Sequence, residues 1–171
     1  MAIDFNQDYF QLFEINCSVE IDEEKLEKKY LDFQKKFHPD KFVNSTDYEK
    51  RLSLQITSYI NEAYETLKDE YLKSLYLLKI KGYEINDQNN TISDPDFLMH
   101  QMELREELEN LKKTKNKIEK DKFTEKIIDL KKNFLLDFKK YFKNEAFGDA
   151  SKKIKKMKFY ISIENDIKKD G

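Results

Sequence analysis

The chain contains very few of the residues that interrupt regular secondary structure. Its 171 residues include only three glycines and two prolines. A sheet protein uses Gly and Pro, together with Asn and Asp, to build its many tight turns, whereas long helices joined by a few loops need little of either. Leucine, isoleucine, lysine and glutamate dominate instead, and this bias is typical of helical proteins. The sequence therefore predicts an all-α fold.

Composition also limits the classes of function. Hydrophobic residues make up 39% of the chain, including thirteen Phe and ten Tyr, which is enough to form a core in one large domain or two small ones. The 32 basic and 34 acidic side chains leave a formal charge of −2. That near balance argues against a nucleic-acid partner, which would favour a basic surface.

Cys17 is the only cysteine, which excludes an internal disulfide and any thiolate-rich metal or cluster site built by this chain alone. We therefore expect no bound metal and no cofactor. A reducing compartment fits this cysteine content. No apolar run approaches the ~20 residues that span a bilayer, and the first residues lack a secretory signal. We expect a cytoplasmic protein with no membrane partner, although a mitochondrial form trimmed of its presequence would look the same.

The first half of the chain predicts a helical hairpin. Apolar residues recur at helical spacing in two segments, about 22–37 and about 46–68. Pro39 must end the first segment, because proline cannot continue a helix. Shorter helices are expected at about 8–15 and from Asp69 to Gly82. The two facing apolar stripes comprise Leu26, Tyr30, Phe33 and Phe37 in the first helix, and Tyr48, Leu52, Ile56, Tyr59, Ile60, Ala63, Tyr64 and Leu67 in the second.

The second half predicts an antiparallel bundle of three helices. A polar segment over residues 84–93 has no apolar period and indicates a loop or linker. Three amphipathic helices follow it, with short connections near 116–121 and 144–145. The expected domains are 1–80 for the hairpin module, 81–95 for the linker and 96–171 for the bundle. The core of the bundle is predicted to contain Phe97, Leu104, Leu108, Leu111, Phe123, Ile127, Leu130, Phe134, Phe138, Tyr141, Ala146, Ala150, Ile154, Met157 and Ile161.

His38, Pro39 and Asp40 are predicted to lie at the tip of the hairpin, where functional residues are common. A His near an Asp could serve acid–base chemistry or bind a metal. We expect Pro39 to hold the pair apart in an extended geometry, and no Ser, Cys or third ligand lies nearby in the sequence. Recognition is therefore favoured over catalysis, with a simple turn-closing role as the alternative. Beside the tip, one side of the preceding helix is basic, with Lys25, Lys28, Lys29, Lys35 and Lys36.

A second candidate surface lies on the first helix of the bundle. At 3.6 residues per turn, Leu98, Met99 and Met102 project away from the core stripe and share a face with Glu103 and Glu106. Clustered apolar side chains beside carboxylates are typical of an interaction surface. The projection also directs Phe159 of the last helix away from the core, where it could join this surface. Packing of Leu98 and Met99 against the first module explains the pattern equally well.

Several segments carry a family resemblance. Asp8 to Phe13, the His38-Pro39-Asp40 tip and Ile60 to Leu67 resemble a J-domain. Ser74 to Leu78 and the longer run Asp94 to Glu109 resemble the HscB family of J-type co-chaperones of iron-sulfur cluster assembly. The similarity covers nearly the whole chain.

The resemblance implies two protein partners and no enzymatic activity. The tip and the five lysines would contact the ATPase domain of a DnaK-class, HscA-like chaperone and stimulate its ATP hydrolysis. In HscB-like proteins the positions matching Leu98, Met99, Met102, Glu103, Glu106 and Phe159 face an IscU-like scaffold, and the cluster belongs to that scaffold. Asn110 stands where the family often has an acidic residue. A general J-protein with another client, and a small acid–base enzyme using His38 and Asp40, are the alternatives.

Overall fold

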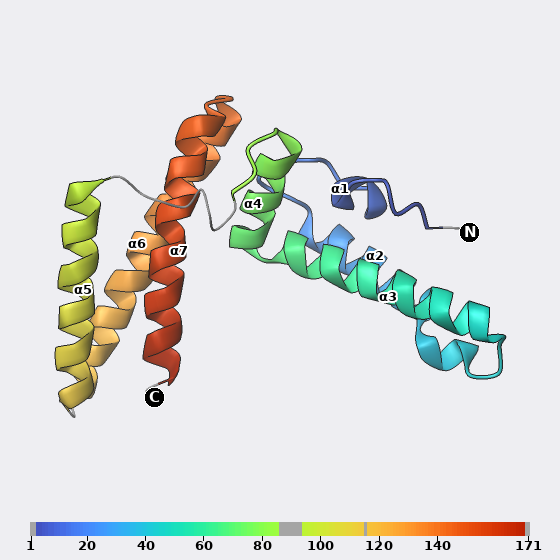
Figure 1. The fold of residues 1–171 in the computed structure, drawn as a ribbon, viewed down its shortest axis with the longest axis horizontal. Helices are drawn as coiled ribbons and strands as arrows, with labels where there is room; N and C mark the ends of the chain where they lie inside the picture. The colour runs from blue at the N-terminus through green and yellow to red at the C-terminus, as the bar shows by residue number, and fades with distance from the viewer. Residues whose placement is uncertain (1–2, 86–93, 115, 170–171) are drawn as a thin grey trace. The chain divides into compact units, whose positions relative to one another are not determined.

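The computed structural model describes residues 3–85, 94–114 and 116–169, and every regular element within these ranges is helical. The all-α prediction is confirmed. The chain divides into two compact units, residues 1–77 and residues 78–171, and Figure 1 shows the helices of each. Most of the predicted linker, residues 86–93, lies outside the described residues. No helix among the described residues has both the length and the apolar character needed to cross a membrane.

The helices of the first unit begin where the sequence provides caps. Asp8, Asp22 and Thr46 each accept a hydrogen bond from a backbone N–H three residues later, which satisfies a donor that the first helical turn leaves open. The elements of this unit are α1 (Tyr9–Leu12), α2 (Glu23–Phe37), the 3₁₀ helix η1 (Pro39–Phe42), α3 (Asp47–Lys68) and α4 (Glu70–Ile80), whose last three residues belong to the second unit.

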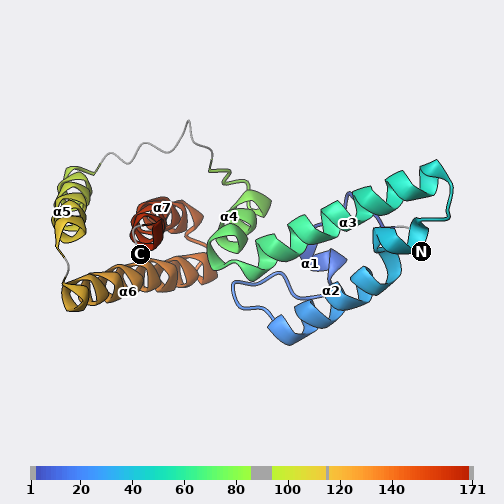
Figure 2. The same ribbon diagram turned by 90° about the horizontal axis from the view of Figure 1, so that it is seen from below.

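Helices α2 and α3 form the predicted antiparallel hairpin (Figures 1 and 2). The Tyr30 ring stacks on the Tyr64 ring with their centres 3.9 Å apart. At the other end of the pair, the hydroxyl groups of Ser53 and Thr57 donate to the carbonyl oxygen of Phe37 at 2.9 and 3.0 Å. The middle of α2 therefore lies beside the end of α3, and the last carbonyl of α2 is held in place where the tip begins.

Helix α1 closes the open side of the hairpin. Phe13 is fully buried and packs edge-on against Phe33 of α2. The Tyr9 hydroxyl donates to Glu62 of α3 at 3.0 Å, and its backbone N–H donates to the Tyr76 hydroxyl of α4 at 3.0 Å. The first unit thus has a core of its own, made from four helices.

The second unit contains α5 (Pro95–Lys113), α6 (Lys117–Lys143) and α7 (Phe147–Lys169), which run alternately up and down (Figure 1). Helices α6 and α7 lie along each other. Their connection turns at Glu145, which has a left-handed φ of 57°. The three helices bury a shared cluster that includes Phe97, Leu104 and Leu108 of α5, Phe123 and Ile127 of α6, and Phe159, Tyr160 and Ile163 of α7.

Three details of the sequence prediction are wrong. Helix α6 begins at Lys117, inside the predicted connection, because Asn116 caps it and accepts from the Glu119 N–H. In α7 the buried stripe continues through Tyr160 and Ile163, while Ile161 is only half-buried. Tyr48 is 68% exposed, because it lies in the first turn of α3, beyond the point where α2 has ended.

Candidate functional site

The tip has a more compact geometry than the sequence predicts. His38 is the C-cap of α2, and Pro39 is the first residue of η1, a position that suits proline because no hydrogen bond from its nitrogen is needed. The turn brings Asp40 back towards His38. The Asp40 N–H donates to His38 Nδ1 at 3.3 Å, and an Asp40 carboxylate oxygen lies 3.6 Å from the same nitrogen. The expectation that Pro39 holds the pair apart is therefore wrong.

Both polar side chains of the tip face solvent. The His38 side chain is 49% exposed and the Asp40 side chain is 87% exposed. Within the described ranges of the chain, no three His, Cys, Asp or Glu side chains are grouped as a metal site requires. A rigid backbone that presents an exposed imidazole and carboxylate is suited to contact with another macromolecule.

The five predicted lysines do not form one uniform stripe. Lys29 pairs with the Glu14 carboxylate at 2.7 Å, and Lys25 donates to the Glu14 backbone oxygen. Glu14 adopts a left-handed φ of 53° just after α1, and the hydrogen bond from Lys29 lowers the pKa of its carboxyl group. Lys25 and Lys29 thus attach α2 to the segment after α1. Lys28, Lys35 and Lys36 are exposed.

Sequence reasoning missed three exposed residues beside the tip. Lys41 is exposed on η1, Val43 is 63% exposed and Tyr48 is 68% exposed. Lys41 directly follows the tip in the sequence and could have been included on that ground. Tyr48 was assigned to the core by its spacing from Leu52, because spacing alone does not show where the facing helix ends.

The second candidate surface is exposed as predicted. Leu98, Met99 and Met102 are 57%, 62% and 65% exposed. Glu103 and Glu106 lie on the exposed side of the same helix, whereas Phe97, Leu104 and Leu108 are buried against α6 and α7. We call Leu98, Met99, Met102, Glu103 and Glu106 the α5 patch. No core function accounts for its three large apolar side chains.

Phe159 does not belong to the α5 patch. Its side chain is 9% exposed and packs edge-on against Phe97 with the ring centres 6.0 Å apart. The Arg105 guanidinium also lies over the Phe159 ring, 5.4 Å from its centre. The predicted exposure of Phe159 is wrong, because the buried stripe of α7 shifts to Phe159, Tyr160 and Ile163 where α5 packs on it.

A specific set of contacts fixes the start of α5 beside the patch. Asp94 caps the helix by accepting from the Phe97 N–H at 3.1 Å, and it also pairs with Lys156 of α7 at 2.5 Å. The hydrogen bond from Lys156, followed by that from Phe97, lowers the pKa of the Asp94 carboxyl group. Lys156 also lies 4.9 Å from the centre of the Phe97 ring. Lys156 therefore contacts both the N-cap residue of α5, Asp94, and its first buried residue, Phe97.

Comparison with known proteins agrees with this organisation. Residues 93–168 match the family model described as the HSCB C-terminal oligomerisation domain. A protein from Aliivibrio fischeri, named a co-chaperone protein HscB homolog, is 35% identical over 160 residues, which cover 93% of this chain and 94% of that protein. A Vibrio cholerae protein of the same name is 32% identical over 162 residues, covering 94% of this chain and 95% of the other.

The fold is also similar to that of solved co-chaperone structures. Chaperone HscB from Vibrio cholerae superimposes with a TM-score of 0.85 at 32% identity, covering 95% of this chain and 96% of that one. The human co-chaperone protein HscB superimposes with a TM-score of 0.89 at 30% identity, covering 98% of this chain and 84% of the human one. The Jac1 co-chaperone from Saccharomyces cerevisiae gives 0.78 at 19% identity, covering 96% of each chain, and shares the fold. The chain belongs to the HscB family of co-chaperones.

Proposed function

We propose that this HscB-family chain binds an IscU-like scaffold protein and presents it to a DnaK-class, HscA-like chaperone, whose ATP hydrolysis it stimulates during iron-sulfur cluster assembly. The observation that carries the proposal is the exposure of Leu98, Met99 and Met102 on a helix whose opposite side is buried. The chain itself catalyses nothing in this proposal. It acts by holding two other proteins.

The tip and the exposed lysines near it would contact the chaperone. Lys28, Lys35 and Lys36 are exposed on α2, and Lys41 adds a fourth positive charge on η1. Such charges raise the rate at which an acidic partner associates and orient it, and the effect weakens as salt increases. His38 and Asp40 project from a turn whose backbone is fixed by Ser53 and Thr57. They would supply the specific contacts that favour hydrolysis in the bound chaperone.

The α5 patch would contact the scaffold. Large flexible apolar side chains such as methionine adapt to a partner surface and lose little by being exposed beforehand. If Leu98, Met99 and Met102 are buried at the centre of the interface, truncating any one of them would cost about 1 to 2 kcal/mol or more of binding free energy. Glu103 and Glu106 would lie at the polar rim, where charge sets orientation more than affinity.

Holding both partners on one chain would make delivery efficient. Once the scaffold is bound, its encounter with the chaperone becomes intramolecular, and its effective concentration there rises to the millimolar range for a short connection. The scaffold and this protein together should therefore stimulate ATP hydrolysis more than the sum of their separate effects.

The test is the rate of ATP hydrolysis by an HscA-like chaperone with the scaffold alone, with this protein alone and with both. We expect stimulation by this protein alone and a more than additive rate with both. The double variant Leu98→Ser/Met99→Ser should still stimulate hydrolysis when added alone, but the rate with scaffold should become merely additive. Ile128→Ser/Leu136→Ser, which removes two exposed apolar side chains of α6, is the matched control and should keep both. Additive rates with the native protein would contradict the proposal.

A further inference from the structure

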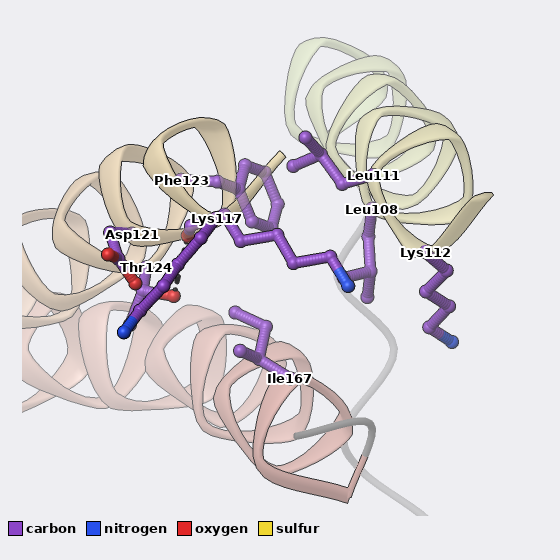
Figure 3. A pocket seen from close by; sticks show the side chains of 9 residues that line it. Leu108, Leu111, Lys112, Lys117, Asp121, Phe123, Thr124 and Ile167 are labelled. Carbon is purple, nitrogen blue, oxygen red and sulfur yellow. Dashed lines mark hydrogen bonds between the residues drawn. The ribbon is translucent and has the colours of Figure 1, made fainter. Parts of the chain in front are cut away.

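The second unit contains a pocket that the α5 patch does not use. It lies where the C-terminal part of α5, the start of α6 and the end of α7 meet, and its volume is about 250 Å³. Leu108 and Leu111 of α5, Phe123 of α6 and Ile167 of α7 point towards one another around it (Figure 3). We call this space the end pocket. Its interior is apolar, and so it favours apolar groups over a hydrated ion.

Basic side chains also line the end pocket. Lys112 of α5 and Lys117 and Lys120 of α6 line it, with Asp121 as the one acidic residue of the lining. Lys112 also pairs with Glu109 at 2.9 Å, which leaves Lys117 and Lys120 as the main source of positive charge. A lining that combines apolar and cationic side chains is complementary to a ligand that has an apolar group next to carboxylates.

The volume of the end pocket limits the size of that ligand. Pockets that enclose cofactors and drug-sized molecules have about 300 to 1,000 Å³, and the end pocket, at about 250 Å³, falls below this range. It is large enough for one or two large apolar side chains. Peptide segments commonly anchor themselves in a partner by inserting such side chains into a pocket.

We propose that the end pocket binds a protein segment in which one or two large apolar side chains are flanked by Asp or Glu. The apolar side chains would contact Leu108, Leu111, Phe123 and Ile167, and the carboxylates would pair with Lys117 and Lys120. This adds an interaction site to the second unit, and it does not depend on the function proposed for the α5 patch.

The end pocket and the α5 patch are separate in position and opposite in charge. The last apolar residue of the patch, Met102, and Leu111 are nine residues apart on α5, which corresponds to roughly 14 Å along the helix. Glu106 and Leu108 are only two residues apart, but Glu106 lies on the exposed side of α5 and Leu108 on the buried side. The patch presents Glu103 and Glu106, which would repel an acidic segment, while the pocket presents lysines. A segment that suits one of these surfaces therefore does not suit the other.

The test uses the full chain and a fluorescein-labelled hexapeptide, Asp-Glu-Leu-Phe-Glu-Asp. We expect saturable binding with a dissociation constant below about 1 mM, and methyl NMR shifts at Leu108, Leu111 and Ile167. Replacing Leu and Phe of the peptide by Ser, or its four acidic residues by Lys, should weaken binding at least about fivefold. Absence of saturable binding, or equal binding of the three peptides, would overturn the proposal.

Three protein variants localise the binding. Lys117→Glu/Lys120→Glu should weaken the peptide at least about fivefold, whereas Lys132→Glu/Lys140→Glu, with the same change of charge at two exposed positions of α6, should leave the dissociation constant within about twofold. Thr124→Met, which fills the pocket from its lining, should also weaken binding. Equal losses in both charge variants would overturn the assignment of the site.

Two other occupants give distinct results. If a second copy of the chain fills the pocket, sedimentation will show self-association that Lys117→Glu/Lys120→Glu abolishes. If a free fatty acid fills it, decanoate will shift the same methyl signals while the hexapeptide does not. Either result would overturn the proposal of a peptide ligand.

Discussion

Individual residues show how closely the core and the exposed apolar surface adjoin in α5 and α7. Phe159 and Leu98 are both large apolar residues that helical projection directs away from the core, yet Phe159 is 9% exposed and Leu98 is 57% exposed. Arg105 covers Phe159 with its guanidinium group, whereas the described part of the chain leaves Leu98 exposed. Whether a residue stabilises the fold or serves a partner is therefore decided by its neighbours on adjacent helices.

This difference predicts opposite effects of truncation. Phe159→Ala should lower the free energy of unfolding by about 3 kcal/mol, because it leaves a cavity among Phe97, Tyr160 and Arg105. Met99→Ala should change it by no more than about 0.5 kcal/mol, since the side chain is already exposed. Urea denaturation measures both. Comparable losses in the two variants would show that Phe159 is not part of the core.

The helices were the most predictable features. Asp22 caps the start of α2 as local hydrogen bonding requires, and Pro39 prevents that helix from continuing. Features that depend on residues distant in sequence were not predictable. Pairing of Glu14 with Lys25 and Lys29, the burial of Phe159 under Arg105 and the end pocket all arise only when separate helices meet.

Ion pairs between helices should make stability depend on pH. Glu164 of α7 pairs with Lys131 of α6 and with Lys168. The hydrogen bond from Lys131 has the larger effect and the one from Lys168 adds to it. Together they lower the pKa of the Glu164 carboxyl group below its ordinary value of 4.5. Because the folded state has the lower pKa, the stabilisation is complete above about pH 4.5 and is lost as the pH falls through the lowered value.

Urea denaturation of Glu164→Gln tests this at several pH values between about 7 and about 3. The variant should be less stable than the native protein at neutral pH, and the difference should shrink as the solution becomes acidic. Glu125→Gln, at an exposed position of α6, should match the native protein throughout. A difference that stays constant from neutral to acidic pH would show that the charge of Glu164 does not cause it.

At the scale of the whole molecule, the chain combines two separately folded units, each with its own exposed surface. The tip belongs to the first unit and the α5 patch to the second. Each surface rests on a core that the other does not share, so a substitution in one should leave the other intact. The proposed function needs this independence, because a chain that links two partners must bind both at once.

In the proposed function, one chain must carry both surfaces. We would measure ATP hydrolysis by an HscA-like chaperone with scaffold, adding His38→Gln, the double variant Leu98→Ser/Met99→Ser, or an equal mixture of the two. His38→Gln should still bind scaffold with native affinity but fail to stimulate hydrolysis, and the double variant should stimulate without synergy. The mixture should also lack synergy, because neither chain links the two partners. Recovery of synergy in the mixture would contradict the proposed function.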